Sequence, residues 1–409
     1  MTQTNDVATY LDDAVRAAAN VEGLDRSAPL PVRTVGIVGA GTMGCGIAAA
    51  FMRSGFPVIL VDFKEEALAG AQERIAAFCA RKAEGLTIGA LTATTDLSAL
   101  APCDLVLEAV FEDMAVKQDL LRRLDGIVRS DAILASNTSY LDLDAMAAAS
   151  ARPERVVGLH FFAPAHIMKL LEVVRGARTS PSVLATALHL GRTLGKVAVV
   201  AGVGEGFIGN RIYNAYRKQC EAMLMAGAMP EEVDGAIEAL GFAMGPFAVS
   251  DLSGLDIAWA NRKRKQAETG DRSDVPVLEW LVARGRLGRK TGAGWYRYED
   301  GKKTPDQEVA DLVVKARADR GIASAPLSHE DIQRRAMAAI VNEALLVLAD
   351  GIARSASDID LVLVNGYGFP KAVGGPLYWA ARQDRERLEA DLALVAGESR
   401  RGDLSLLGG

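Results

Sequence analysis

The sequence of 409 residues has little of several features that mark whole classes of protein. Its four cysteines, Cys45, Cys79, Cys103 and Cys220, show no C-x-x-C spacing, which argues against a metal site or a disulfide scaffold and favours a reducing compartment. The net charge of −6 leaves no basic surplus to neutralise phosphates, so we expect no nucleic-acid partner. No apolar run reaches the roughly 18 residues of a membrane span, and the first residues are neither basic nor apolar. The protein is therefore expected in the cytoplasm, without a membrane partner or a bound metal.

What the sequence does contain is an alternation of short apolar runs and helical stretches, beginning at Arg33. Half of the residues are hydrophobic, as in globular proteins, and the length allows two or three domains. Apolar runs bounded by helices predict parallel strands buried on both faces. We predict strands at 34–38, 57–62, 105–110, 132–136, 156–160 and 196–201. We predict helices at 5–19, 45–53, 64–84, 141–149, 181–194, 208–226 and 231–240.

The first predicted strand leads into Gly39-Ala-Gly-Thr-Met-Gly44, and an acid, Asp62, closes the next strand. A Gly-x-Gly-x-x-Gly between strand and helix is the context of a dinucleotide-binding turn. Gly39 permits the tight turn, Gly41 lets the backbone approach a pyrophosphate, and Gly44 lets helix and strand pack closely. Asp62 can accept from ribose hydroxyls and would repel a 2′-phosphate. The pattern predicts NAD rather than NADP, although Asp62 could also cap a helix.

Polar residues follow two later strands of this predicted sheet. Asn137-Thr-Ser-Tyr140 comes after one strand, and His160 ends another. Carboxyl ends of parallel strands face the ligand crevice. A histidine there can take a proton from an alcohol, and Glu172 could hold that imidazole and balance its charge. The alternatives are a purely structural His160, and a helix cap formed by Thr138 or Ser139.

Beyond about residue 204 the chain is predicted to be helical and weakly repeated. Glu221, Asp234 and Gly245-Pro246 have counterparts in Glu343, Asp360 and Gly375-Pro376, at an offset that drifts from 122 to 130. The run 262–265 (Arg-Lys-Arg-Lys) is either a solvated helix face or a phosphate contact. The first 31 residues contain an amphipathic segment with Leu11, Val15 and Ala18 on one side, which either docks on the body or is disordered. We predict units at 1–31, 32–203, 204–303 and 304–409.

With these motifs, the chain resembles the L-3-hydroxyacyl-CoA dehydrogenases of fatty-acid β-oxidation. The resemblance rests on the glycine motif and on five further stretches that begin at Glu108, Ser136, His160, Gly206 and Met244. The duplicated helical part is similar to the dehydrogenase region of the multifunctional enzymes, whose hydratase half we expect to be absent. The resemblance implies a Rossmann-type NAD-binding α/β domain followed by two all-α helical domains. It also implies oxidation of an L-3-hydroxyacyl-CoA to a 3-ketoacyl-CoA.

Family roles transfer to matching positions. By resemblance His160 is the general base, Glu172 orients and charge-stabilises it, and Ser139 and Asn210 position the substrate oxygens. The residues expected to contact NAD are Gly39, Gly41, Thr42, Met43, Gly44, Asp62, Glu112 and Lys117. Two departures concern the acyl pocket: Ala163 stands where the family often has Asn, and Tyr140 stands where a small residue is common.

Three questions remain open at this stage. The substrate could instead be a free 3-hydroxy acid of the carnitine or sugar-acid type, or the chain could be a non-catalytic NAD-binding protein. The second helical copy could cover within one chain the surface through which short members of the family dimerise. We therefore predict a monomer with an internal pseudo-dimer, with a homodimer as the alternative.

Overall fold

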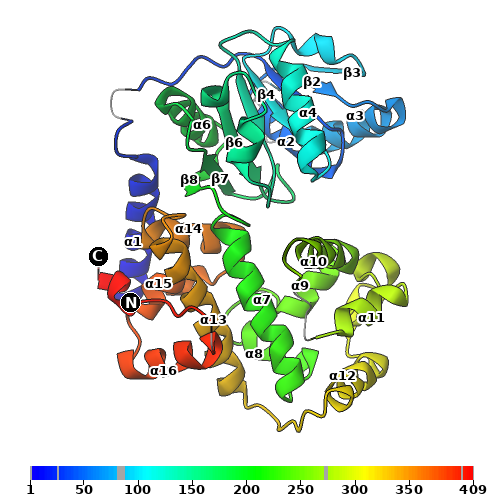
Figure 1. Cartoon of the computed structure of the whole chain (residues 1–409), viewed down its shortest axis with the longest axis vertical. Coiled ribbons are helices and arrows are strands. Elements are labelled where there is room, and N and C mark those ends of the chain that lie inside the picture. The colour runs from blue at the N-terminus through cyan, green and yellow to red at the C-terminus, as the bar shows by residue number, and fades with distance from the viewer. Residues whose placement is uncertain (1, 25–26, 81–87, 271–274, 398, 409) are drawn as a thin grey trace.

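The computed structural model describes residues 2–24, 27–80, 88–270, 275–397 and 399–408. Figure 1 shows a sheet domain above a body built almost wholly of helices. Helix α1 (Thr2–Ala19) precedes the sheet in the chain but packs against the helical body, beside α14 (Ala356–Gly366).

The sheet has eight strands in the order β3-β2-β1-β4-β5-β6-β7-β8. The first six run parallel, whereas β7 pairs antiparallel with β6 and parallel with β8. The order places β1 between β2 and β4, so the crevice opens beyond the carboxyl ends of β1 and β4. The strands are β1 (Val35–Val38), β2 (Val58–Val61), β3 (Leu91–Thr94), β4 (Leu105–Glu108), β5 (Ile133–Ser136), β6 (Val156–Phe161), β7 (Leu170–Arg175) and β8 (Val197–Gly202).

Five helices cover the two faces of this sheet. Buried apolar residues of α2, α3 and α6 pack on one face, and those of α4 and α5 pack on the other. The bounds are α2 (Thr42–Arg53), α3 (Glu65–Ala80), α4 (Met114–Asp125), α5 (Leu143–Ala147) and α6 (Pro181–Thr193). The two cores are separated by strands that are buried on both faces, as the continuous apolar runs predicted.

Two strands of this sheet were not predicted. β3 (Leu91–Thr94) is a half-exposed edge strand with too few apolar residues to stand out. β7 (Leu170–Arg175) is buried over its first five residues, but a glutamate at its centre breaks the apolar run. The predicted helix at 64–84 is described as α3 up to Ala80, and its remainder lies outside the described residues. The alternative in which Thr138 or Ser139 caps the following helix is not what the structure shows, because the Asp142 side chain caps α5.

The helical body contains two successive groups of helices and one small hairpin. The hairpin, β9 (Arg297–Glu299) with β10 (Lys302–Thr304), corrects the prediction of an all-α region. The first group is α7 (Gly209–Ala226), α8 (Pro230–Glu238), α9 (Pro246–Ser253), α10 (Leu255–Thr269), α11 (Val277–Ala283) and α12 (Gln307–Asp319). The second is α13 (His329–Ala349), α14, α15 (Pro376–Ala380) and α16 (Arg385–Ala396). Helix α13 crosses α7 and packs along it.

The two groups use the same carboxylate framework. In the first, Asp234 accepts hydrogen bonds from two N–H groups at the start of α9 and from the Tyr296 hydroxyl, each at 2.9 Å. In the second, Asp360 accepts from two N–H groups at the start of α15 and, at 2.6 Å, from the Tyr10 hydroxyl of α1. Helix α1 thus supplies the tyrosine that the second group lacks. It docks through Leu11, Ala14 and Ala18, whereas Val15, predicted to share this face, is exposed.

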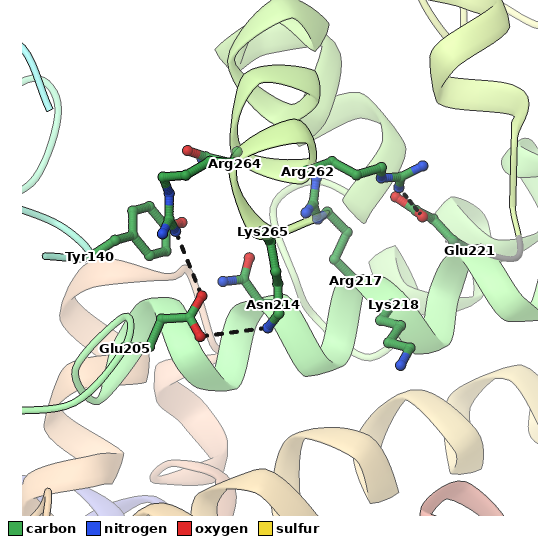
Figure 2. Close-up of a pocket in the computed structure, with 10 residues that line it drawn as sticks. Tyr140, Glu205, Asn214, Arg217, Lys218, Glu221, Arg262, Arg264 and Lys265 are labelled. Carbon is green, nitrogen blue, oxygen red and sulfur yellow. Dashed lines mark hydrogen bonds and ion pairs between the residues drawn. The ribbon is translucent and has the colours of Figure 1, made fainter. Parts of the chain in front are cut away.

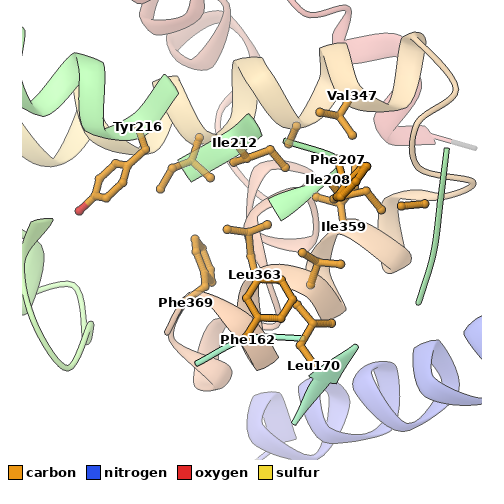
Figure 3. Close-up of a cluster of buried hydrophobic side chains, with 14 of the residues drawn as sticks. Phe162, Leu170, Phe207, Ile208, Ile212, Tyr216, Val347, Ile359, Leu363 and Phe369 are labelled. Atoms are coloured by element: carbon orange, nitrogen blue, oxygen red, sulfur yellow. The ribbon is translucent and has the colours of Figure 1, made fainter. Parts of the chain in front are cut away.

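A buried apolar cluster joins the sheet domain to both helical groups (Figure 3). Phe162 and Leu170 come from the segment containing β6 and β7, and Ile208 comes from the start of α7. Ile359 and Leu363 of α14 pack against them. The second helical group therefore reaches the strands on which the predicted catalytic residues stand.

Candidate active site

The glycine-rich turn after β1 has the backbone that the motif requires. Gly39 has φ of +107°, a conformation that L side chains rarely adopt. A Cβ on Gly44 would lie 1.8 Å from the Gly39 carbonyl oxygen, whereas a Cβ on Gly41 would meet open space. Helix α2 begins at Thr42, earlier than predicted, so its first N–H groups lie beside this turn. The turn leaves open room where a pyrophosphate would approach the helix N-terminus.

Asp62 lies next to the same turn. Its Oδ2 accepts from the Ala40 N–H at 2.7 Å, and its Oδ1 accepts from the Lys64 N–H at 3.0 Å. These bonds hold the carboxylate at the carboxyl end of β2, where an adenine ribose would lie. The turn and Asp62 together fit the NAD that the sequence predicted.

His160 and Glu172 face each other across two paired strands. They are register partners in the antiparallel ladder of β6 and β7, and His160 Nδ1 lies 2.7 Å from Glu172 Oε2. Both are buried, with His160 4% and Glu172 0% exposed. An Nδ1–H that donates to Glu172 leaves the Nε2 lone pair free to accept a proton. In the described part of the chain, no hydrogen bond to Nε2 is recorded.

The second oxygen of Glu172 binds the start of α7. Oε1 accepts from the Ile208 N–H at 3.2 Å and from the Gly209 N–H at 3.0 Å. These donors follow a turn in which Gly206 and Phe207 both have positive φ, 77° and 49°. Helix N-termini stabilise negative charge through free N–H groups and the helix dipole. The carboxylate is thus held between the imidazole and the helix that carries Asn210.

Asn210 is bound in turn by the second helical group. The Tyr367 hydroxyl, at the end of α14, donates to Asn210 Oδ1 at 2.8 Å. The Tyr367 ring crosses the start of α7 so closely that a Cβ on Gly209 would lie 2.1 Å from it. The ring also packs edge-on against Phe162, with centroids 5.5 Å apart. Tyr367 therefore fixes the oxygen of the Asn210 amide, which leaves the amide N–H₂ to face a ligand.

Ser139 stands in a loop that Glu112 holds. Oε1 of Glu112 accepts from the Thr138 hydroxyl at 2.6 Å, the Ser139 N–H at 2.7 Å and the Tyr140 N–H at 3.1 Å. Burial alone would raise the pKa of Glu112, but Lys117 and these three bonds lower it. The ionised carboxylate thus orders the loop after β5, and the Ser139 hydroxyl is carried on it.

Lys117 lies beneath this loop rather than on its surface. It is 1% exposed, and its Nζ contacts Glu108 at 2.8 Å and Glu112 at 3.3 Å. Burial raises the pKa of Glu108 despite the ammonium group and the Ser136 hydroxyl, which also donates to it. Lys117 therefore charge-balances two acids under the site. A direct contact of Glu112 or Lys117 with NAD stays a prediction.

Three functional contacts were missed by sequence reasoning. Asn137 Oδ1 accepts from the Phe161 N–H at 2.8 Å and so fixes the end of the strand that carries His160. Glu108 and Tyr367 were also given no role. Glu108 ends β4 and Asn137 directly follows β5, a position that could have indicated both residues. Tyr367 had none, because it lies 157 residues from its partner.

Comparison with known proteins places this site in a family. Residues 34–205 match the family model of the 3-hydroxyacyl-CoA dehydrogenase NAD binding domain, and residues 206–298 match the C-terminal domain of the same family. A solved structure, FadB2 of M. tuberculosis, is 37% identical, and this chain covers 100% of it with a TM-score of 0.60. This chain belongs to the 3-hydroxyacyl-CoA dehydrogenase family. The predicted family, its NAD-binding domain and the fold class are confirmed.

Two longer matches extend past the short family members. The FadB2 match covers 66% of this chain, whereas the structure of 3-hydroxybutyryl-CoA dehydrogenase from Escherichia coli covers 93% of it. That E. coli structure is 28% identical, is 98% covered and has a TM-score of 0.74. The peroxisomal bifunctional enzyme of Danio rerio is 39% identical over 383 residues, which are 89% of this chain and 53% of the relative. The chain spans about half the length of such curated relatives.

Two kinds of feature are absent from the described part of the chain. Its His, Cys, Asp and Glu side chains form no group of three that could hold a metal ion. None of its helices combines the length and the apolar character needed to cross a bilayer. The relatives are named peroxisomal enzymes, so the cytoplasmic location stays a prediction.

Proposed function

We propose that the protein oxidises the 3-hydroxyl of an L-3-hydroxyacyl-CoA to the 3-ketone, with NAD as the cofactor. The observation that carries this proposal is the bound pair of His160 and Glu172 at the junction of the sheet and α7. Bound NAD would accept a hydride from C3 of the substrate. Every other requirement of the reaction falls on residues of this chain.

The proton is the first requirement. Nε2 of His160 takes the proton of the 3-hydroxyl as the C–H bond breaks, since Nδ1 is occupied by Glu172 at 2.7 Å. The imidazolium that forms is balanced by the Glu172 carboxylate, which the two N–H groups of α7 keep in place. In the reverse direction the same imidazolium returns the proton to the ketone oxygen.

Positioning is the second requirement. Ser139 and the Asn210 amide stand on separate, braced elements: the loop held by Glu112 and the start of α7 held by Tyr367. We assign them to the oxygens of the substrate, where a hydrogen bond stabilises charge that develops during the transfer. Bracing of this kind keeps reacting atoms in an attack geometry, which is a large share of enzymatic rate acceleration.

The substrate class can be tested by measuring the initial rate of NADH oxidation with acetoacetyl-CoA and, in parallel, with free acetoacetate. The proposal predicts turnover of the thioester and at least a hundredfold lower kcat/KM for the free acid. Comparable rates would favour a dehydrogenase of free hydroxy acids. Turnover of neither compound would contradict the proposal.

We further propose that the protein is a monomer. Helix α13 lies along α7. The Arg211 guanidinium of α7 forms ion pairs with the carboxylates of Glu343, at 2.6 Å, and Asp350, at 2.8 Å. The second helical group thus covers within one chain a face that would otherwise need a partner. Light scattering at low micromolar concentration should give the monomer mass, about 43 kDa. A stable dimer would contradict this proposal.

A further inference from the structure

A polar pocket of about 190 Å³ lies between α7, α10 and the loop after β5 (Figure 2). Tyr140 borders it from the loop, Asn214 and Arg217 from α7, and Arg262 and Arg264 from α10. The Arg264 guanidinium lies over the Tyr140 ring, 5.1 Å from its centroid. From the sequence, Tyr140 is a departure that concerns the acyl pocket, and the basic run of α10 is a solvated face or a phosphate contact; the structure brings the two together.

The pocket carries an excess of positive charge. Five cationic side chains and two carboxylates line it, which gives a net charge of +3. The cations are Arg217, Lys218, Arg262, Arg264 and Lys265, and the carboxylates are Glu205 and Glu221. Glu221 pairs with Arg262, and Glu205 lies 3.6 Å from Arg264 and 3.7 Å from Lys265. A pocket that concentrates one sign of charge attracts a ligand of the other sign.

Arg217 is the cation best placed to meet such a ligand. It is half-buried and, among the residues that the structure describes, no ion pair or hydrogen bond is recorded for it. In Figure 2 its side chain reaches from α7 toward α10, across the pocket. Arginine binds carboxylates and phosphates through two parallel N–H donors.

The pocket adjoins residues of the candidate active site. Tyr140 directly follows Ser139, and Asn214 stands one helical turn beyond Asn210 on the same face of α7. Arg217 is a further turn along, so its Cα is about 10 Å from that of Asn210 at 1.5 Å per residue. A group held by Arg217 would thus belong to the same ligand that Asn210 contacts.

We propose that this pocket binds a negatively charged group of the acyl-CoA substrate, held chiefly by Arg217. The inference rests on the proposed function. Two parts of the substrate have this chemistry: a carboxylate at the far end of the acyl group, and a phosphate of coenzyme A. The short span from Asn210 to Arg217 favours the carboxylate, because the whole pantetheine arm separates the thioester from the phosphates.

The experiment compares Arg217→Gln with the wild type on three ketones of matched acyl length. The first is 3-oxohexanoyl-CoA. The second is 3-oxoadipyl-CoA, which has a carboxylate in place of the terminal methyl group. The third is 3-oxohexanoyl-pantetheine, which lacks the phosphates. The control variant is Lys263→Gln, which removes the same charge from α10 outside the pocket lining. Among the residues that the structure describes, this substitution disrupts the contact of Lys263 with the Trp259 ring. For each enzyme the ratios of kcat/KM between substrates are measured, so that changes in folded fraction cancel.

We expect Arg217→Gln to lower the ratio of 3-oxoadipyl-CoA to 3-oxohexanoyl-CoA about tenfold, the loss of one charge-assisted pair. A tenfold fall in the ratio of 3-oxohexanoyl-CoA to its pantetheine analogue would instead identify the phosphate as the bound group. If both ratios stay within twofold of wild type, or if Lys263→Gln changes them equally, the inference is overturned. A wild type that turns over none of the three would overturn the proposed function as well.

Discussion

The two helical groups share a framework but differ where a substrate would lie. Glu221 and Glu343, at the offset of 122, stand on α7 and α13, and both form ion pairs with an arginine. The same offset sets Ile332 against Asn210. Asn210 is partly exposed at the site, whereas Ile332 is fully buried. At this position the first group has a polar residue at the site, and the second has a core residue.

The second group reaches the site through the first group and through the segment that contains β6 and β7. Tyr367 binds Asn210, and Glu343 and Asp350 bind Arg211, the next residue of α7. Its own carboxylate framework is completed by Tyr10 from outside the group. One helical group thus carries Asn210 of the proposed site, while the other group and α1 hold that group in position.

The largest effects are expected from alanine substitutions at Asn210 of the first helical group and at Ile332, the equivalent position of the second. Asn210→Ala should lower kcat/KM for acetoacetyl-CoA by about 100-fold with little change in stability, since it removes a donor to developing charge. Ile332→Ala should cost about 2–5 kcal/mol of unfolding free energy and leave the kcat of the folded protein near wild type. Steady-state kinetics and urea unfolding measure the two effects. The reverse pattern would refute the division of labour.

A smaller effect is expected at the two framework tyrosines, and it should depend on pH. Burial raises the pKa of Asp360 to about 7, and the Tyr10 hydroxyl partly opposes that rise. When the pKa of a carboxyl is raised in the folded state, the free energy of unfolding falls as the pH rises from the pKa of the unfolded chain, about 4, through the folded pKa of about 7. The Tyr10 bond favours the ionised form, so Tyr10→Phe should cost about 1–2 kcal/mol at pH 8 and less at pH 5.

The matched variant in the first group is Tyr296→Phe. Burial raises the pKa of Asp234 to about 6, so the same dependence should appear about one pH unit lower. Thermal or urea unfolding between pH 5 and 8 measures both. Equal losses at every pH would show that the hydroxyls act by packing rather than by binding the carboxylates.

The hydrogen bond from Tyr367 of the second helical group to Asn210 can be removed by deleting one oxygen atom. Tyr367→Phe removes the hydroxyl that binds Asn210 and keeps the ring, so kcat should fall about three- to tenfold, equivalent to one neutral hydrogen bond. KM for NADH should not change. Asn365→Ala is the control, because among the described residues the Asn365 amide donates within α14, to the Leu361 carbonyl. A kcat equal to wild type would remove Tyr367 from the positioning of Asn210.

The weakest expected effect is at Arg211. It is a partly exposed residue with two ion pairs, so Arg211→Gln should cost no more than about 1 kcal/mol, and the loss should shrink with added salt. Urea unfolding at low and high ionic strength measures it. A salt-independent loss would show that the side chain stabilises by packing along α7 instead.

The glycine-rich turn and the acid at the end of β2 could be placed from the sequence, whereas their contacts with NAD stay predictions. Gly39, Gly44 and Asp62 are constrained by local backbone geometry, which a short motif can encode. The sequence was also sufficient to place His160 at the end of a strand, because that strand reads as an unbroken apolar run.

The sequence was not sufficient for the contacts that organise the site. The register that sets Glu172 opposite His160 depends on β7, and a buried charge concealed that strand. The bonds from Tyr367 to Asn210 and from Tyr10 to Asp360 join residues 157 and 350 positions apart. Such contacts depend on how helices pack, and local periodicity carries no information about them.

The most direct test of the central claim is a single-turnover measurement with His160→Gln. NADH and acetoacetyl-CoA are mixed with excess enzyme, and His189→Gln, at an exposed position on α6, is the control. The account predicts at least a 100-fold slower conversion for His160→Gln with unchanged NADH affinity, the loss expected when a general acid-base is removed. A conversion rate within threefold of wild type would contradict the assignment of the proton transfer to His160.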